Sequence, residues 1–275
     1  DFDLGDLQAL ADSFDNDIYP TNREFFGSEW NPGIDGDPRV YIVYAQGLGV
    51  FLAGYFSSAD SVHPMAHEYS NGHETFFFSA DNVQFEEEFT YGVLAHEFQH
   101  MIHWYRDSNE ETWLNEGFSE LSMLLNGYDT GGSEYAFTIE PDMQLTNWLG
   151  GDADNTANYG ASFMFTTYFL GRFGEDLTKA LVADPQNGFA SIDGVFSANN
   201  VRDPQTGQII TADDFFADWA IANFLMDGNV EDGRYDYSMY PNAPEVYASE
   251  YPECPLEDFQ DATVHQYGTD YLMLY

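Results

Sequence analysis

The chain has 275 residues, with 48 acidic residues against 7 Lys and Arg, and its formal net charge at pH 7 is -41. Nucleic-acid binding rests on Lys and Arg side chains that neutralise phosphates, so this composition excludes a nucleic acid as the expected partner. The same shortage of positive charge argues against an anionic membrane surface, and the sequence has no run of about 18 apolar residues that would span a bilayer.

The remaining composition is that of a folded domain. Hydrophobic residues make up 44% of the chain and aromatic residues 17%, which is sufficient for a large core. A single cysteine rules out an internal disulfide framework. The excess of acidic residues predicts adaptation to a salty medium, where screening weakens self-repulsion. An acidic secreted protein that binds calcium is the alternative.

The apolar pattern places the predicted strands in the N-terminal part of the chain. Apolar residues at helical spacing first predict a helix over residues 2–16. Two apolar segments, 40–45 and 50–56, are separated by Gln46–Gly49 and predict a β-hairpin. The Phe-rich segment 74–80 predicts a third strand.

Most predicted helices follow these strands. Amphipathic patterns predict helices over 86–105, 115–126, 160–173, 175–184 and 212–227, whereas residues 127–158 are expected to be irregular. Strands followed by helices indicate the α+β class rather than alternating βαβ units. We expect one domain over residues 1–260, with subdomains at about 1–106 and 107–260 around a cleft. Residues 261–275 predict a strand that begins a further β module.

The segment His96-Glu97-Phe98-Gln99-His100 has the H-E-x-x-H pattern and lies inside the predicted helix 86–105. Spacing of four residues puts both imidazoles on one helix face, where they can bind one zinc ion. Glu97 can reach a metal-bound water and act as its general base. His103 is about 10.5 Å along the helix from His96, too far to share that metal. It is expected to line the cleft or to support a ligand by a hydrogen bond, unless it is simply a packed histidine.

A catalytic zinc site needs a third protein ligand and one open position. Glu116 and Glu120 supply two carboxylates at a spacing of four residues on the next predicted helix. One of them can bind the metal while the other holds a ligating histidine through a hydrogen bond. A purely structural zinc site would instead be expected to have four ligands and no neighbouring base.

The H-E-x-x-H helix followed by Trp113–Glu120 resembles the gluzincin metallopeptidases. The stretch Trp113–Phe118 is similar to the segment that carries the third zinc ligand in the aminopeptidase-N-like branch. The fuller pattern is more similar to the secreted hyicolysin-like bacterial neutral metallopeptidases, as are Gly54–Phe56 and Asn158–Ser162. The resemblance covers residues 40–175, about half of the chain.

This resemblance implies a zincin-like fold, with a β-sheet subdomain that carries the active-site helix and a mostly helical C-terminal subdomain. It implies zinc bound by His96, His100 and Glu116, with Glu120 supporting a histidine and Glu97 as the base. Glu116 follows His100 by sixteen residues, fewer than in thermolysin-like enzymes, and Glu120, at twenty, fits their distance better. The local motif favours Glu116, because connection lengths vary more easily than helix register.

Three further features belong to this hypothesis. Tyr159 is the predicted donor to the oxyanion, since a Tyr or His has this role in related enzymes, and a structural tyrosine is the alternative. An extended substrate is expected to pair with segment 74–80 as a sheet edge, with an ordinary core strand as the alternative. Asp152 and Asp154 are predicted calcium ligands, with a solvated acidic turn as the alternative.

The sequence therefore predicts a secreted, extracellular zinc endopeptidase that hydrolyses protein or peptide substrates. The cofactors expected are Zn²⁺ and, at the acidic loop, Ca²⁺. A pro-segment and a C-terminal β module are further expected partners. An aminopeptidase is the alternative enzyme, although the chain has no Gly-x-Met-x-Asn-like string. A calcium- or zinc-dependent binding module without catalysis is the third possibility.

Overall fold

The computed structural model describes residues 3–50, 52–150, 153–248 and 263–273. The chain divides into two units, each with its own core: residues 1–109 with 118–131, and residues 110–117 with 132–275. Helix α4 (Thr112–Leu125) begins in the second unit and continues in the first.

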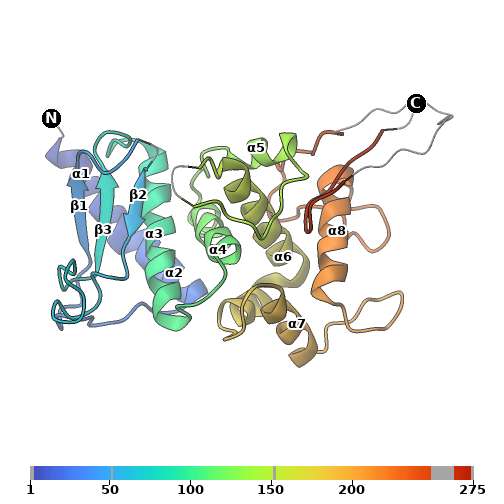
Figure 1. The fold of residues 1–275 in the computed structure, drawn as a ribbon, viewed down its shortest axis with the longest axis horizontal. Coiled ribbons are helices and arrows are strands. Elements are labelled where there is room, and N and C mark those ends of the chain that lie inside the picture. The colour runs from blue at the N-terminus through green and yellow to red at the C-terminus, as the bar shows by residue number, and fades with distance from the viewer. Residues whose placement is uncertain (1–2, 51, 151–152, 249–262, 274–275) are drawn as a thin grey trace. The chain divides into compact units, whose positions relative to one another are not determined.

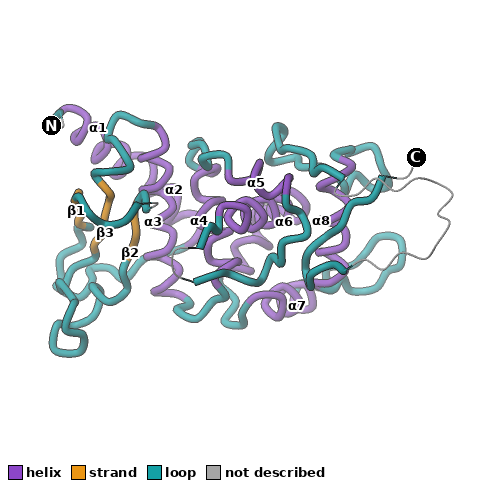
Figure 2. The backbone as a smooth tube through the Cα atoms, turned by 45° about the horizontal axis from the view of Figure 1, so that its top comes forward, coloured by secondary structure: helices purple, strands orange, loops and turns teal. Residues whose placement is uncertain are grey.

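The first unit contains a sheet of three strands, β1 (Tyr41–Ala45), β2 (Gly54–Phe56) and β3 (Thr75–Ser79), in the order β1-β3-β2. β3 is parallel to β1 and antiparallel to β2. Figures 1 and 2 show β3 between the other two. The predicted hairpin is therefore wrong, because the segments 40–45 and 50–56 each pair with β3 and not with each other.

The central position of β3 also overturns the prediction that segment 74–80 forms a substrate-binding edge. Phe76 and Phe78 have no exposed surface, and Thr75 and Ser79 are buried as well. A strand with so little exposed surface suits the centre of a sheet, where both neighbours cover it. The edge strand that packs against the long helix α3 is β2.

Helices cover this sheet. α1 (Leu4–Ser13), a π-helical turn (Phe14–Ile18) and α2 (Tyr19–Phe26) follow one another without a break, so the helix predicted over 2–16 is longer than expected. α3 (Glu88–Arg106) packs on α2 and β2, and its Phe98 ring contacts that of Phe14 at 5.2 Å.

The second half of α4 packs closely against α3. A Cβ atom on Gly92 of α3 would lie 2.6 Å from Cε of Met123 and 3.3 Å from the carbonyl oxygen of Asp129. Asn22 of α2 donates from Nδ2 to the carbonyl oxygen of Ala95 at 2.8 Å, and its own Oδ1 accepts from Asn126. Glycine and buried amides thus hold α2, α3 and the end of α4 together.

The second unit is helical, with α5 (Ser133–Ile139), α6 (Thr156–Val182), α7 (Gly188–Ala198) and α8 (Ala212–Leu225). α6 packs against α5 and α7, and α7 packs against α8. Gly174, with φ of 78°, interrupts the helical backbone of α6. This break separates the two helices predicted at 160–173 and 175–184.

Helices α5 and α7 were not predicted. α5 has only seven residues and lies in the segment expected to be irregular. α7 contains two glycines, which have low intrinsic helix propensity. Tertiary packing compensates, because Phe196 of α7 stacks on Phe169 of α6 with ring centroids 5.7 Å apart.

The whole is a mixed α+β structure, with a small sheet and a mostly helical remainder, and the predicted fold class is confirmed. The arrangement is compatible with a zincin-like fold. Of the predicted strand at 261–275, the described residues 263–273 are irregular apart from one bridge residue, Leu272. Tyr267 in this segment stacks on Phe189 of α7 with ring centroids 4.1 Å apart.

Candidate metal centre

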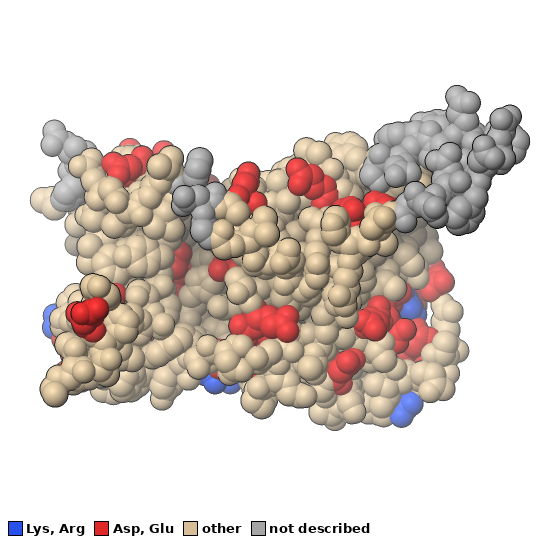
Figure 3. All heavy atoms as spheres, viewed as in Figure 1, with Lys and Arg blue, Asp and Glu red and all other residues tan. Residues whose placement is uncertain are grey.

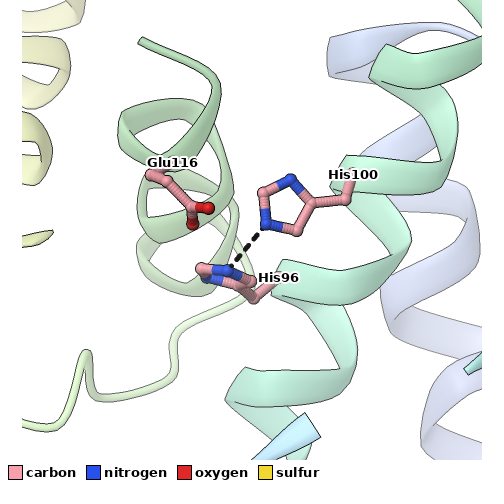
Figure 4. Close-up of side chains that lie close together, drawn as sticks. All are labelled: His96, His100 and Glu116. Atoms are coloured by element: carbon pink, nitrogen blue, oxygen red, sulfur yellow. Dashed lines mark hydrogen bonds between the residues drawn. The ribbon is translucent and has the colours of Figure 1, made fainter. Parts of the chain in front are cut away.

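Two imidazoles from α3 face a carboxylate from α4 (Figure 4). The Nε2 atoms of His96 and His100 lie 3.0 Å apart, because a spacing of four residues stacks them on one face of α3. Ligand atoms of His96, His100 and Glu116 all lie within 4.8 Å of one another. The structure thus brings together the three residues that the sequence proposes as metal ligands.

The other ring nitrogen of each histidine has a partner on α4. His96 Nδ1 lies 3.1 Å from Oε1 of Glu120, and His100 Nδ1 lies 3.0 Å from Oγ of Ser119. A carboxylate accepts a hydrogen bond from Nδ1–H, so the lone pair of neutral His96 is on Nε2, toward His100. The contact between Glu120 and His96 is the one expected of a carboxylate that supports a metal-binding histidine.

The donor chemistry fits zinc. Two neutral imidazoles and one carboxylate form a common three-ligand set of catalytic zinc sites, whereas calcium prefers oxygen ligands alone. Two nitrogen lone pairs turned toward each other at 3.0 Å repel unless a proton or a cation lies near both. The geometry of His96 and His100 is therefore well suited to hold a cation.

Glu97 follows His96 directly on α3 and is 5% exposed. Its Oε2 accepts a hydrogen bond of 2.8 Å from the backbone N–H of Phe56 in β2. The backbone of the edge strand thereby holds the orientation of the carboxylate. The segment Gly54–Phe56 belongs to the resemblance, but its contact with Glu97 was not predicted, because a backbone donor leaves no signature in residue type.

His103 is buried on α3, and its ring meets that of Phe118 edge-on, with centroids 5.8 Å apart. Its Nδ1 lies 3.4 Å from Nε2 of Gln99. Among the described residues, His103 also forms a second group of potential metal ligands with Asp107 and Glu110, at the end of α3.

Tyr159 and the acidic loop lie around the start of α6. The Tyr159 ring packs edge-on against Trp148 with centroids 4.8 Å apart. Asp154 is exposed, and its Oδ1 accepts hydrogen bonds from the hydroxyl and the backbone N–H of Thr156, which lower the pKa of that carboxyl. Asp152 lies outside the described residues. In the ranges that the structure covers, Asp154 joins no group of three potential metal ligands.

Gln99 and Ser119 received no role from the sequence: Gln99 is at an unspecified position of H-E-x-x-H, and Ser119 belongs to the second motif only as part of the resemblance. Both side chains are fully buried, and Ser119 Oγ donates a hydrogen bond to Gln99 Oε1. A small polar residue on the inner face of a helix is the signal that marks Ser119, but its partner is decided only by the packing of α3 against α4.

Comparison with known proteins finds a distant relative. The chain is 28% identical over 211 residues to the neutral metalloprotease ShpI of Staphylococcus hyicus, an alignment that covers 67% of this chain and 47% of that protein. The chain therefore spans about half the length of this relative. No model of a known protein family matches the sequence. Among the helices of the described ranges, none combines the length and the apolar character that crossing a bilayer requires. The chain is thus distantly related to a metalloprotease, and it carries a group of side chains suited to a divalent metal.

Proposed function

We propose that the chain is a zinc-dependent endopeptidase of the gluzincin type. The observation that carries this proposal is the convergence of His96 Nε2, His100 Nε2 and the Glu116 carboxylate, with Glu97 next to His96 on α3. The distant relationship to a metalloprotease supports the same chemistry.

His96, His100 and Glu116 would hold the zinc ion. When bound, zinc polarises a peptide carbonyl and lowers the pKa of water from 15.7 to about 7 in enzymes of this kind. Glu97 takes the proton of the attacking water and passes it to the nitrogen of the leaving amine. Because Oε2 of Glu97 accepts the hydrogen bond from Phe56 N–H, we assign this proton transfer to Oε1 of Glu97.

The position of Tyr159 supports its proposed role as a donor to the oxyanion. Tyr159, Ser162 and Thr166 share one face of α6, since their spacings of three and four residues follow the helical repeat. Thr166 Oγ1 donates to the carbonyl oxygen of Gly117 at 2.8 Å, and a Cβ on Gly117 would lie 2.8 Å from the Ser162 oxygen. Tyr159 therefore lies one turn before Ser162, on the face of α6 that packs against Gly117, the residue after Glu116.

The open edge of β2 offers a place for an extended substrate. Ser79 N–H of β3 donates to the carbonyl oxygen of Ala53, and Tyr55 is paired with Phe77. The backbone N–H and C=O groups alternate in direction along a strand. Those of Gly54 and Phe56 therefore face away from β3, and the Phe56 N–H donates to Glu97. We propose that a peptide substrate pairs with this edge, next to the general base.

We further propose that the enzyme acts outside the cell and in a medium of high ionic strength. The chain carries 48 acidic and 7 basic residues, and Figure 3 shows acidic side chains spread over one face with few basic ones. Counterions at high salt screen the repulsion within such a surface. Calcium binding at Asp154 stays a prediction.

Casein cleavage by the wild-type protein and by Glu97→Gln, both supplied with zinc, tests the function. Loss of a general base typically lowers the rate by about 10²- to 10⁴-fold, and zinc should stay bound because its ligands are unchanged. Glu88→Gln, at an exposed position of the same helix, is the matched control. Equal activity of wild type and Glu97→Gln would refute the assignment.

A peptide blocked at its N-terminus separates the two kinds of peptidase. An endopeptidase cleaves it at an internal bond, whereas an aminopeptidase requires the free amino group. Cleavage of only the unblocked peptide would overturn the endopeptidase proposal. Zinc binding without cleavage of casein or of either peptide would favour the binding module.

A further inference from the structure

The two histidines that face each other in the candidate metal centre have chemically different partners. His96 Nδ1 meets the carboxylate of Glu120 at 3.1 Å. His100 Nδ1 meets a neutral hydroxyl, Ser119 Oγ, at 3.0 Å, and this hydroxyl also contacts the amide of Gln99. Gln99, Ser119 and His103 are at most 1% exposed, so water does not compete for these hydrogen bonds.

The direction of the hydrogen bonds follows from the number of protons. A hydroxyl has one proton, and the amide oxygen of Gln99 can only accept, so Ser119 donates to Gln99 Oε1. In the hydrogen bond between Ser119 Oγ and His100 Nδ1, the donor is therefore the N–H group of the imidazole. His100 is therefore protonated on Nδ1, and its lone pair is on Nε2, toward His96.

His103 lies at the other end of this series of hydrogen bonds. The amide group Nε2 of Gln99 lies 3.4 Å from His103 Nδ1 and donates to it. The two ends of the Gln99 amide thus have different partners, an acceptor nitrogen on His103 and a donor hydroxyl on Ser119. This orientation of the amide requires the lone pair of His103 to be on Nδ1, whereas a reversed amide would require Nδ1–H.

We propose that Gln99 and Ser119 are positioning residues that set which ring nitrogen of His100 carries the proton and so prepare its Nε2 for the metal. This inference deepens the proposed function and rests on the assignment of His100 as a zinc ligand. His103 contributes by orienting the Gln99 amide, which gives a role to the histidine that lies too far along the helix to share the metal.

The negative charge of the neighbouring carboxylates explains why an uncharged hydrogen-bond partner suits His100. The candidate centre already contains the carboxylates of Glu116 and Glu120, and Glu97 follows His96 on α3, so another carboxylate behind His100 would increase the repulsion among them. The Ser119 hydroxyl, which donates to the Gln99 amide, accepts the hydrogen bond from His100 Nδ1–H without adding charge.

The variants Ser119→Ala and Ser119→Thr test the proposal, with Ser122→Ala as the matched control. Ser122 is equally buried on the same helix, but its hydroxyl donates to the backbone oxygen of Ser119 and not to a histidine. Removal of an outer partner of a ligating histidine typically weakens metal binding by about 10- to 100-fold. We expect that loss for Ser119→Ala alone, with recovery in Ser119→Thr, in a chelator competition for zinc.

The metal-free protein provides an independent measurement. Nitrogen-15 NMR of the imidazole rings distinguishes Nδ1–H from Nε2–H histidine, and we expect Nδ1–H for His100 in the wild type. In Gln99→Leu the Ser119 hydroxyl loses its acceptor and can donate to His100, so the Nε2–H form should increase. Thermal unfolding of the same samples shows whether each variant is folded.

Three results would overturn the proposal: Nε2–H at His100 in the wild type, zinc affinity in Ser119→Ala equal to that in Ser122→Ala, or an unchanged tautomer in Gln99→Leu. None of these measurements uses peptide cleavage. A wild-type protein that binds zinc but cleaves nothing would contradict the proposed function and leave the positioning role intact.

Discussion

The backbone N–H of Phe56 donates a hydrogen bond of 2.8 Å to Oε2 of Glu97. This bond joins the edge strand β2 to the helix that carries the proposed base. It explains how a carboxylate on one helix can be oriented by a residue 41 positions earlier in the chain. A hydrogen bond to a charged group typically contributes about 1.5–3 kcal/mol.

Removal of this donor should therefore lower turnover. Phe56→Pro lacks the N–H, and proline is tolerated on an edge strand where that N–H does not face the neighbouring strand. We expect kcat to fall by about tenfold or more, because about 1.4 kcal/mol corresponds to a factor of ten. Phe56→Leu keeps the N–H and serves as the control. Equal kcat in the two variants would show that the bond does not orient the base.

Neutralising the two carboxylates of α4 should have unequal effects on zinc binding. Glu116→Gln removes a proposed ligand, whereas Glu120→Gln removes only the partner of His96 Nδ1. We expect Glu120→Gln to lose about 10- to 100-fold in zinc affinity and Glu116→Gln to lose more. Chelator competition measures both, with the exposed Glu24→Gln as a control. The reverse order would make Glu120 the ligand, as the thermolysin-like spacing suggests.

Gly160→Ala should destabilise the second unit. A Cβ at this position would lie 2.1 Å from the carbonyl oxygen of Ser133, a backbone atom that cannot turn aside. Overpacking of this kind typically costs about 1–3 kcal/mol, so the thermal midpoint should fall. Gly150→Ala, where a Cβ meets open space, should change the midpoint little. Similar midpoints for the two variants would mean that α5 and α6 pack less closely than the structure shows.

Acid should weaken the structure around Arg234. Backbone hydrogen bonding from Thr206, and next the Arg234 guanidinium, lower the pKa of Asp203 to about 2. Between that value and the ordinary pKa of 3.8, the unfolded chain binds more protons than the folded one, so this group makes stability rise with pH. The contribution is present above pH 3.8 and is lost as pH falls through about 2.

Asp203→Asn should therefore unfold with a weaker pH dependence than the wild type over that interval. Urea unfolding at several pH values measures the difference, and the exposed Asp176→Asn is the control. If both variants follow the wild-type slope, the hydrogen bonds from Thr206 and Arg234 do not lower the pKa of Asp203 in solution.

Salt should stabilise the protein as a whole. With a net charge of -41, repulsion between carboxylates favours the expanded chain at low ionic strength. The screening length is about 10 Å at 0.1 M salt and about 3 Å at 1 M, so this repulsion weakens steeply over that range. We expect the thermal midpoint to rise from 0.1 to 1 M KCl. A midpoint that falls over this range would contradict salt adaptation.

Local patterns in the sequence were sufficient to predict α3 and the two histidines that project from it. A helix has one repeat, so residues four positions apart must share a face wherever the helix packs. The same reasoning predicted the break near Gly174 and the α+β order of elements. These features depend on interactions between residues close to one another in the sequence, so a local pattern is sufficient to predict them.

Tertiary structure alone decided the strand order, the helices α5 and α7, and the hydrogen-bond partners of the side chains in the candidate metal centre. β1 and β2 are separated by β3, because an almost fully buried strand gains most when both neighbours cover it, and no local pattern encodes that choice. Phe56, Gln99 and Ser119 likewise act through contacts with residues that are distant in sequence. The physical reason is that residue type sets which hydrogen bonds a group can make, whereas only packing sets which partner it meets.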